Sequence, residues 1–259
     1  MITYKLLEKY KEIAHFCTDR EGGANMGNYA SFNMSPFSGD EPMHVADNQQ
    51  ILCDRLGIKP EELIIPYQIH GTEIREIDTR FLLLTKEERS QALNGIDALF
   101  TQIPKICIGV TTADCVPLQF YDPVRKVIAV AHAGWRGTCA RIGEKTILSL
   151  VERYCCNPAD IRVTIGPSIS QKAYEVGNET VANFEAAGFD ISGIVTAWND
   201  SSYLDLWKAN QQSLIKAGIR VEHIETSGSC TFTEQKRFFS ARRLGIKSGR
   251  MLSGMMLID

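Results

Sequence analysis

The sequence lacks the features of secreted, membrane-spanning and nucleic-acid-binding proteins. No stretch approaches the roughly 20 apolar residues that a membrane-spanning helix needs, and residues 1–11 mix charges into their apolar positions, unlike a secretion signal. A formal charge of −3 offers no basic surface for a polyanion. We therefore expect a cytoplasmic protein that binds neither a membrane nor nucleic acid.

Histidine is scarce, and this scarcity excludes some metal chemistry. The five histidines contain no His-x-His pair, whereas a multicopper oxidase needs many histidines, so we expect no true laccase activity. The His-x-Glu and Pro-Cys-x-x-Cys signature of zinc nucleobase deaminases is also missing. The eight cysteines form no Cys-x-x-Cys motif and no regular framework, which predicts reduced thiols.

Composition and periodicity predict an α/β fold. Hydrophobic residues make up 44% of the chain and charged residues 23%, as in ordinary globular proteins. No Pro/Gly/Ser-rich linker divides the sequence, so we expect one domain over residues 1–259. Short apolar runs bounded by turn residues predict strands over 106–110, 118–121, 126–131, 161–165 and 255–258.

Helices are expected between and around these strands. Residues 138–154 carry apolar side chains at a three-to-four spacing, which predicts one helix with a buried face. Further helices are expected over 45–56, 179–187 and 203–217, the last with Ser201 and Ser202 as capping candidates and Gly218 at its end. Strands that alternate with helices suggest a central sheet.

Three residues with metal-binding side chains, His70, Cys115 and His132, each lie where an apolar stretch breaks into a loop. Two imidazoles and one thiolate suit Zn²⁺, and three protein ligands leave a fourth tetrahedral position open for water or substrate. Such an open position indicates catalysis. The intervals between the three residues are too long for a compact zinc finger, and a buried cysteine is most often a small hydrophobic residue. Spacing alone therefore leaves both readings open.

The predicted strands suggest how these ligands meet. Sites in open α/β sheets lie beyond the carboxyl ends of the strands, and His132 falls at the end of the strand over 126–131. Cys115 lies in the connection after the strand over 106–110. If these two strands are neighbours in one sheet, both ligands come together, and His70 arrives from the N-terminal part of the chain.

The stretch Ala-His-Ala-Gly-Trp-Arg-Gly at 131–137 is a highly specific motif. Six further segments belong with it: Gln68–Gly71, Thr112–Pro117, Ile165–Ile169, Tyr174–Gly177, Cys230–Phe232 and Phe238–Ser240. In this order they resemble the motifs of the YfiH-like family, also called the laccase-domain or purine nucleoside phosphorylase family. The likeness extends from Arg20 to Met251 and so covers nearly the whole chain.

The resemblance implies a single-domain α/β sandwich with a central mixed sheet flanked by helices, and a zinc held by His70, Cys115 and His132. It further implies phosphorolysis of adenosine, inosine and S-methyl-5′-thioadenosine, with adenosine deamination as a second activity and a disputed phenol oxidase activity. Copper is the less expected ion. Where family members commonly read Ser-Tyr-Arg-Arg-Asp, this chain has Ala241 and Leu244, so roles tied to that Tyr and Asp do not transfer.

Phosphorolysis requires a site for phosphate near the metal. Zn²⁺ with one thiolate and two neutral imidazoles carries a net charge of +1, which attracts an anion. Arginine offers bidentate donors to phosphate. The nearest candidate in the sequence is Arg136, and the others are Arg20, Arg242 and Arg243, although the last two also fit a solvated basic turn.

Other polar residues near the motifs are candidates for catalysis or substrate binding. Asp114 is expected either to orient His70 or His132, to transfer a proton, or only to cap a loop. The amides of Gln68 and Asn33 are candidates for reading the ribose or the base. Trp135 either stacks on a purine or packs in the core.

Together these features predict a zinc-dependent purine nucleoside phosphorylase whose partners are a purine nucleoside and phosphate, active as a monomer or weak homodimer. One alternative is a hydrolase, for example of a cell-wall precursor, in which Cys115 is the nucleophile and His132 its base. Another is a regulatory binding module with a structural zinc. A ligated thiolate cannot attack a substrate, so metal occupancy separates the first two.

Overall fold

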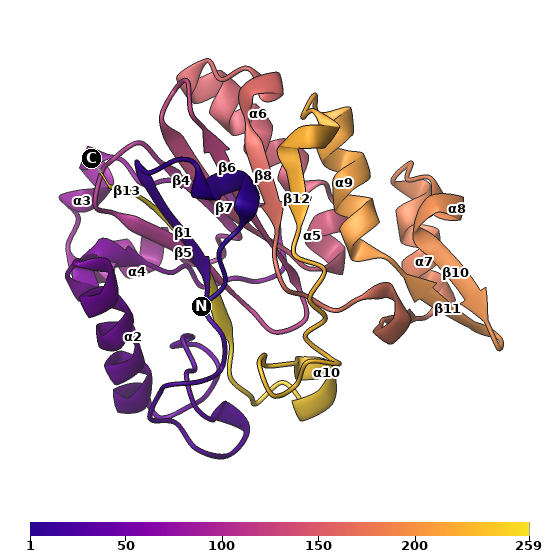
Figure 1. Cartoon of the computed structure of the whole chain (residues 1–259), viewed down its shortest axis with the longest axis horizontal. Coiled ribbons are helices and arrows are strands. Elements are labelled where there is room, and N and C mark those ends of the chain that lie inside the picture. Colours follow the sequence, from indigo (N-terminus) through magenta and orange to yellow (C-terminus); the bar gives the residue numbers. More distant parts are fainter. Residues whose placement is uncertain (259) are drawn as a thin grey trace.

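The computed structural model describes residues 1–258 and shows two β-sheets packed face to face, with helices on their outer sides (Figure 1). The larger sheet has the strand order β12-β8-β6-β7-β4-β3 and mixes parallel with antiparallel pairs. The predicted α/β class with a mixed sheet is therefore confirmed. The strands of this sheet are β3 (Ile74–Glu76), β4 (Ala98–Thr101), β6 (Val116–Asp122), β7 (Val127–Ala133), β8 (Arg162–Ile165) and β12 (Ile224–Thr226).

The smaller sheet contains the predicted strand over 106–110 and the C-terminal strand. We expected the strand over 106–110 to lie beside that over 126–131, but the two belong to different sheets. They pack across the layer between the sheets, where Ile108 and Val110 join Ile128 and Val130 in one apolar cluster. The strands of the smaller sheet, in spatial order, are β1 (Ile13–Cys17), β13 (Met251–Leu257), β5 (Cys107–Thr112) and β2 (Leu63–Ile64).

Strand β7 shows why the central strands are apolar throughout. Ile128 and Val130 belong to the layer between the two sheets, whereas Ala129 and Ala131 belong to the cluster beneath the helices. A strand buried on both faces has no position for polar alternation. This double burial makes β7 a rigid base for His132, which lies one residue before the strand ends.

Helices cover the outer faces of both sheets. On the larger sheet lie α5 (Trp135–Cys139), α6 (Ile142–Tyr154) and α9 (Leu206–Lys216), and on the smaller sheet lies α2 (Pro42–Leu56). The remaining α-helices of the described residues are α1 (Lys5–Glu8), α3 (Thr79–Leu82), α4 (Lys86–Ala92), α7 (Asn178–Ala186), α8 (Ile191–Ile194) and α10 (Ala241–Leu244). Short 3₁₀ helices span Gly27–Tyr29, Pro60–Glu62, Pro158–Asp160, Gln171–Ala173 and Val221–His223.

Two predicted helices differ from the structure. The expected helix over 138–154 is two helices, because Arg141 adopts a left-handed φ of 61° between α5 and α6. The expected helix over 203–217 begins only at Leu206, where Asp205 caps it by accepting a hydrogen bond from the Lys208 amide at 3.0 Å. Ser201 and Ser202 are not caps, since they lie in the strand β11 (Ser201–Leu204).

An arm extends from the sheets at the right of Figure 1. It consists of β9 (Glu175–Val176), β10 (Val195–Trp198) and β11, which form a small antiparallel sheet, together with α7 and α8. The other predicted helices and strands occur within a few residues of their expected bounds. Among the described residues, no helix has both the length and the apolar character needed to cross a membrane.

Candidate metal centre

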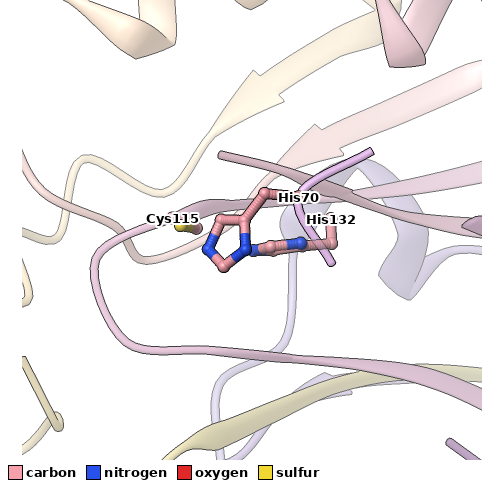
Figure 2. A group of neighbouring side chains, drawn as sticks. All are labelled: His70, Cys115 and His132. Atoms are coloured by element: carbon pink, nitrogen blue, oxygen red, sulfur yellow. The ribbon is translucent and has the colours of Figure 1, made fainter. Parts of the chain in front are cut away.

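The three predicted ligands meet at one edge of the sandwich, where their side chains point toward one another (Figure 2). His132 comes from β7, Cys115 from the turn between β5 and β6, and His70 from the loop after β2. The ligand atoms all lie within 4.8 Å of one another, and the two imidazole rings are 4.8 Å apart at an angle of 74°. In residues 1–258 this is the one such group of three or more His, Cys, Asp or Glu side chains.

A buried carboxylate, Asp97, holds both histidines in place. Its Oδ1 lies 2.7 Å from Nδ1 of His132, and its two oxygens accept hydrogen bonds from the amides of Ile69, His70 and Gly71 at 2.8–3.2 Å. With Nδ1 donating to Asp97, Nε2 is the ring nitrogen of His132 that remains to bind a metal. The same carboxylate stabilises the loop in which His70 has an unusual φ of 64°.

Gly134 makes room for the centre. A Cβ at this position would lie 3.0 Å from Cys115 Sγ and 3.1 Å from Cδ2 of the His70 ring. Glycine is therefore favoured here by space, because its φ of −62° suits any residue but a Cβ would push the two side chains away by a few tenths of an ångström. The absence of a side chain lets the chain turn from β7 into α5 directly behind two of the ligands.

The charges of the centre favour a thiolate. Burial alone would raise the pKa of Cys115, but the charge of His132 and hydrogen bonds from both histidines lower it to about 6. Burial would lower the pKa of His132, yet the Cys115 thiolate and Asp97 raise it to about 9. Near neutral pH the pair is a thiolate beside an imidazolium, and a metal must displace the imidazolium proton.

The donor set and its spacing fit a metal ion. A tetrahedral Zn²⁺ with bonds of about 2.0–2.3 Å separates its ligand atoms by roughly 3.5 Å, and the 4.8 Å limit accommodates that separation. Three protein ligands leave one position open. All three residues line a cavity of about 610 Å³, which is within the range of small-molecule sites.

The cavity combines polar and apolar side chains. The aromatic rings of Phe37 and Tyr67 lie edge to face at its wall, 5.0 Å apart and both about half exposed. Thr112 also lines it, and within the described chain its buried hydroxyl has no hydrogen-bond partner. An unsatisfied buried hydroxyl beside a cavity is suited to a polar ligand atom. Its other polar side chains include Ser35, Ser38, Gln68, Asp114, Tyr174, Arg242 and Arg250.

Two predicted residues that line the cavity are held by the protein itself. Asp114 does not orient His70 or His132, because its oxygens accept from Thr231 Oγ1, Ser240 Oγ and the Arg242 amide at 2.7–3.0 Å. Gln68 does not present a free amide either, since it pairs with the backbone and hydroxyl of Thr111. These contacts tie the C-terminal segment and the His70 loop to the centre.

Five predicted residues, Trp135 among them, lie outside the cavity lining. The Arg20 guanidinium donates to Ala30 O and Gln235 O, and Arg243 Nε donates to Phe232 O. Arg136 is exposed and stacks on Trp135, which packs against the core. Asn33 is fully buried and bonds Ser38 and Asp40. Of the predicted arginines, Arg242 alone lines the cavity, and its guanidinium contacts Glu175 O.

Sequence reasoning missed Asp97, Thr112, Tyr174 and Arg250. A signal for Asp97 was present, since an acidic residue stands directly before the buried run 98–101. Thr112 and Tyr174 lie inside the matching motifs. Arg250 immediately precedes the strand β13, and the apolar residues of that strand gave no signal for it.

The sequence matches the family described as "Multi-copper polyphenol oxidoreductase laccase" over residues 14–258. The chain is 42% identical to a Bacteroides thetaiotaomicron protein named "Purine nucleoside phosphorylase", covering 99% of this chain and 96% of that one. It is 39% identical to "Adenosine deaminase RL5" from an unknown prokaryotic organism, covering 94% and 93%. The crystal structure of YlmD from Geobacillus stearothermophilus superposes with a TM-score of 0.91 at 30% identity, covering 97% and 94%.

Proposed function

The chain belongs to the family described as multi-copper polyphenol oxidoreductase laccase, and from this premise we propose that it is a zinc-dependent purine nucleoside phosphorylase. The observation that carries the proposal is the three-ligand centre at a cavity of nucleoside size that also holds arginine side chains. Names of relatives in several bacteria support the same reaction. We propose adenosine, inosine and S-methyl-5′-thioadenosine as substrates.

Zinc is proposed from the chemistry of the donors. Thiolate and imidazole suit Zn²⁺, whereas the five histidines of the chain are too few for a multicopper cluster. When bound, Zn²⁺ supplies a Lewis acid at its open position, where it stabilises negative charge on an oxygen. Asp97 keeps His132 in the tautomer that presents Nε2, and Gly134 leaves the space that the ligands need.

The cavity residues would position the two reactants. In phosphorolysis a phosphate oxygen forms a bond to C1′ of the ribose while the bond from C1′ to the purine nitrogen breaks. Phe37 and Tyr67 offer aromatic surface for a base. Burial and the Cys115 charge raise the pKa of Tyr174 to about 12, so its hydroxyl stays protonated and able to donate.

Product analysis of adenosine tests this proposal. Zinc-loaded protein is incubated with adenosine with and without phosphate, beside Cys115→Ala and the matched control Cys155→Ala, whose thiol is exposed and outside the cavity. Adenine and ribose 1-phosphate are expected only with phosphate, and only in the wild type and the control. If no phosphate-dependent product forms from any of the three nucleosides, the proposed reaction is wrong.

Deamination is a second candidate activity, favoured by the 39% identity to a protein named adenosine deaminase. We expect inosine and ammonia from adenosine without any need for phosphate, at the same centre. The product analysis separates the two reactions, because only phosphorolysis cleaves the glycosidic bond. Absence of inosine in phosphate-free samples would remove this candidate.

Hydrolysis through Cys115 is a third candidate, favoured by the sequence of contacts from Asp97 to His132 to Cys115. This order matches a nucleophile, its base and the group that orients the base. In that case Cys115 reacts with iodoacetamide in the purified protein as isolated. Under the zinc proposal, metal ligation protects Cys115 until a chelator removes the ion.

A further inference from the structure

Arg250 is a cation in the cavity that its own chain holds rigidly. Its Nη1 donates to Ser248 O at 2.7 Å, Ser248 Oγ at 3.1 Å and Gly249 O at 3.0 Å, and its Nη2 donates to Ile246 O at 2.9 Å. The Arg250 amide donates to Asn33 Oδ1 at 2.9 Å. Asn33 is in turn fixed by Ser38 and Asp40. The guanidinium is therefore positioned before any ligand arrives.

This cation has no anionic partner within the described residues. No carboxylate of residues 1–258 forms an ion pair with Arg250, whose contacts are carbonyl oxygens and one hydroxyl. The charges of Cys115 and Asp114 act on Arg250, but neither group forms an ion pair with it, and the Asp114 oxygens already accept from Thr231, Ser240 and the Arg242 amide. A half-buried positive charge without an ion pair is costly for the protein alone, and a bound anion would offset that cost.

Two nitrogens of the Arg250 guanidinium keep an N–H that donates to no protein atom of the described residues. Arginine has five N–H groups, and the contacts above use both on Nη1 and one on Nη2. The N–H of Nε and one on Nη2 remain, and these neighbouring nitrogens are the pair that binds phosphate in a bidentate manner. Arg20 differs, because its Nε and Nη2 both donate to Ala30 O.

We propose that Arg250 binds a tetrahedral oxyanion through Nε and Nη2, and that this anion is inorganic phosphate in the proposed phosphorolysis. The identity of the anion rests on the proposed function, whereas the anion site rests on the geometry of Arg250. Arg250 and the three ligand residues line the same cavity. The proposal replaces Arg20, Arg136 and Arg243 as phosphate-binding residues.

Calorimetric titration of zinc-loaded protein with inorganic phosphate tests the site without turnover. Loss of a bidentate charged contact is expected to raise the phosphate Kd about 10- to 100-fold in Arg250→Gln. Arg250→Lys keeps the charge but loses the bidentate geometry, so a smaller rise of about 3- to 10-fold is expected. The matched control Arg220→Gln removes an exposed arginine outside the cavity and is expected to leave the Kd unchanged.

The KM values of the same variants give a second readout. The KM for phosphate is expected to follow the Kd, whereas the KM for the nucleoside changes little. If Arg250→Gln binds phosphate as tightly as the wild type, or the wild type binds none, the inference is overturned. Phosphate binding that depends on Arg250 in a protein without phosphorolysis would instead overturn the proposed function and keep the anion site.

If Arg250→Gln does not fold, NMR of the wild-type protein tests the same inference. The ¹⁵N resonance of Arg250 Nε, assigned by its loss in Arg250→Lys, is followed as phosphate is added to the wild type. A saturable shift with the calorimetric Kd is expected. A resonance that stays in place while phosphate binds would place the anion elsewhere and overturn the inference.

Discussion

Two buried aspartates hold two walls of the same cavity, with different consequences. Asp97 and Asp114 each accept hydrogen bonds from backbone amides and from side chains. Asp97 bonds directly to a ligand ring and to the loop of a second ligand, whereas Asp114 bonds the C-terminal segment that carries Arg242. The same residue type therefore holds the candidate metal ligands at one wall and the C-terminal segment at the other.

The largest expected effect follows from Asp97→Asn. The amide keeps one acceptor but places an NH₂ group against donors, so His132 and the His70 loop lose their fixed orientation. Loss of such a partner typically weakens metal binding about 10- to 100-fold. Competition for zinc with a chromogenic chelator measures this change.

Asp122→Asn is the matched control for Asp97→Asn. Asp122 is also fully buried and accepts from two turn amides, those of Val124 and Arg125, but lies outside the cavity lining. We expect it to lower thermal stability while its zinc affinity equals that of the wild type. Equal zinc affinity in Asp97→Asn and Asp122→Asn would contradict the role given to Asp97.

Apart from these substitutions, a change of pH is expected to alter zinc affinity strongly. The His132 pKa of about 9 keeps its ring protonated at neutral pH, and the Cys115 pKa of about 6 keeps its thiol ionised. Between these values zinc must displace one proton from His132, so its apparent affinity rises about tenfold per pH unit. Chelator competition from pH 5.5 to 9.5 measures the slope, which steepens below about 6 as Cys115 takes up a proton.

Asp97→Asn sharpens this second prediction. Asp97 raises the pKa of His132, so its neutralisation is expected to move the upper end of the slope to lower pH. Asp114→Asn is expected to leave the pH profile in place, because Asp114 contacts neither histidine. A zinc affinity that does not vary between pH 6.5 and 8.5 would contradict the assigned thiolate and imidazolium pair.

A smaller effect is expected from Gly134→Ala. The added Cβ would press on Cys115 Sγ and the His70 ring, which must shift by a few tenths of an ångström. We expect zinc affinity to fall about 3- to 10-fold, since metal sites tolerate little displacement. Gly177→Ala is the control, because Gly177 also caps a helix at a negative φ but has open space around it. Equal affinities in the two variants would show that the centre adapts to the methyl group.

The smallest effect on zinc is expected from Asp114→Asn. Its lost bonds to Thr231, Ser240 and the Arg242 amide would cost about 1–3 kcal/mol of stability, measured by denaturant unfolding. Zinc affinity should change less than threefold, within the usual effect of a residue that does not contact a ligand. If Asp114→Asn lost as much zinc affinity as Asp97→Asn, the different roles given to the two aspartates would be wrong.

The contrast between the aspartates also explains what the sequence could predict. His70, Cys115 and His132 stand in recognisable motifs at the ends of apolar runs, so their meeting as a candidate metal site was predictable. Orienting a histidine was one of the roles expected of Asp114, because this residue adjoins Cys115 in the sequence. Asp97 takes that role because the antiparallel register pairs Ala98 with Ala131 and so places Asp97 opposite His132. Such a register is not visible in a single sequence.

The fold was predictable to a similar extent. Apolar runs predicted the strands, but a run buried on both faces does not reveal which sheet it joins, so the strand over 106–110 was assigned to the wrong neighbour. Helical periodicity continued through Arg141, although its backbone is left-handed and its guanidinium donates to Ala187 O and Gly188 O. Local pattern predicted the elements, and contacts between distant residues decided their arrangement.

X-ray absorption spectroscopy of the purified protein at the zinc and copper edges tests the central claim most directly. We expect zinc near stoichiometry, with one sulfur at about 2.3 Å and light atoms at about 2.0–2.1 Å. The sulfur contribution should disappear in Cys115→Ala and persist in Cys155→Ala. A copper edge in place of zinc, or a zinc shell without sulfur in the wild type, would contradict the assignment of His70, Cys115 and His132 as a zinc centre.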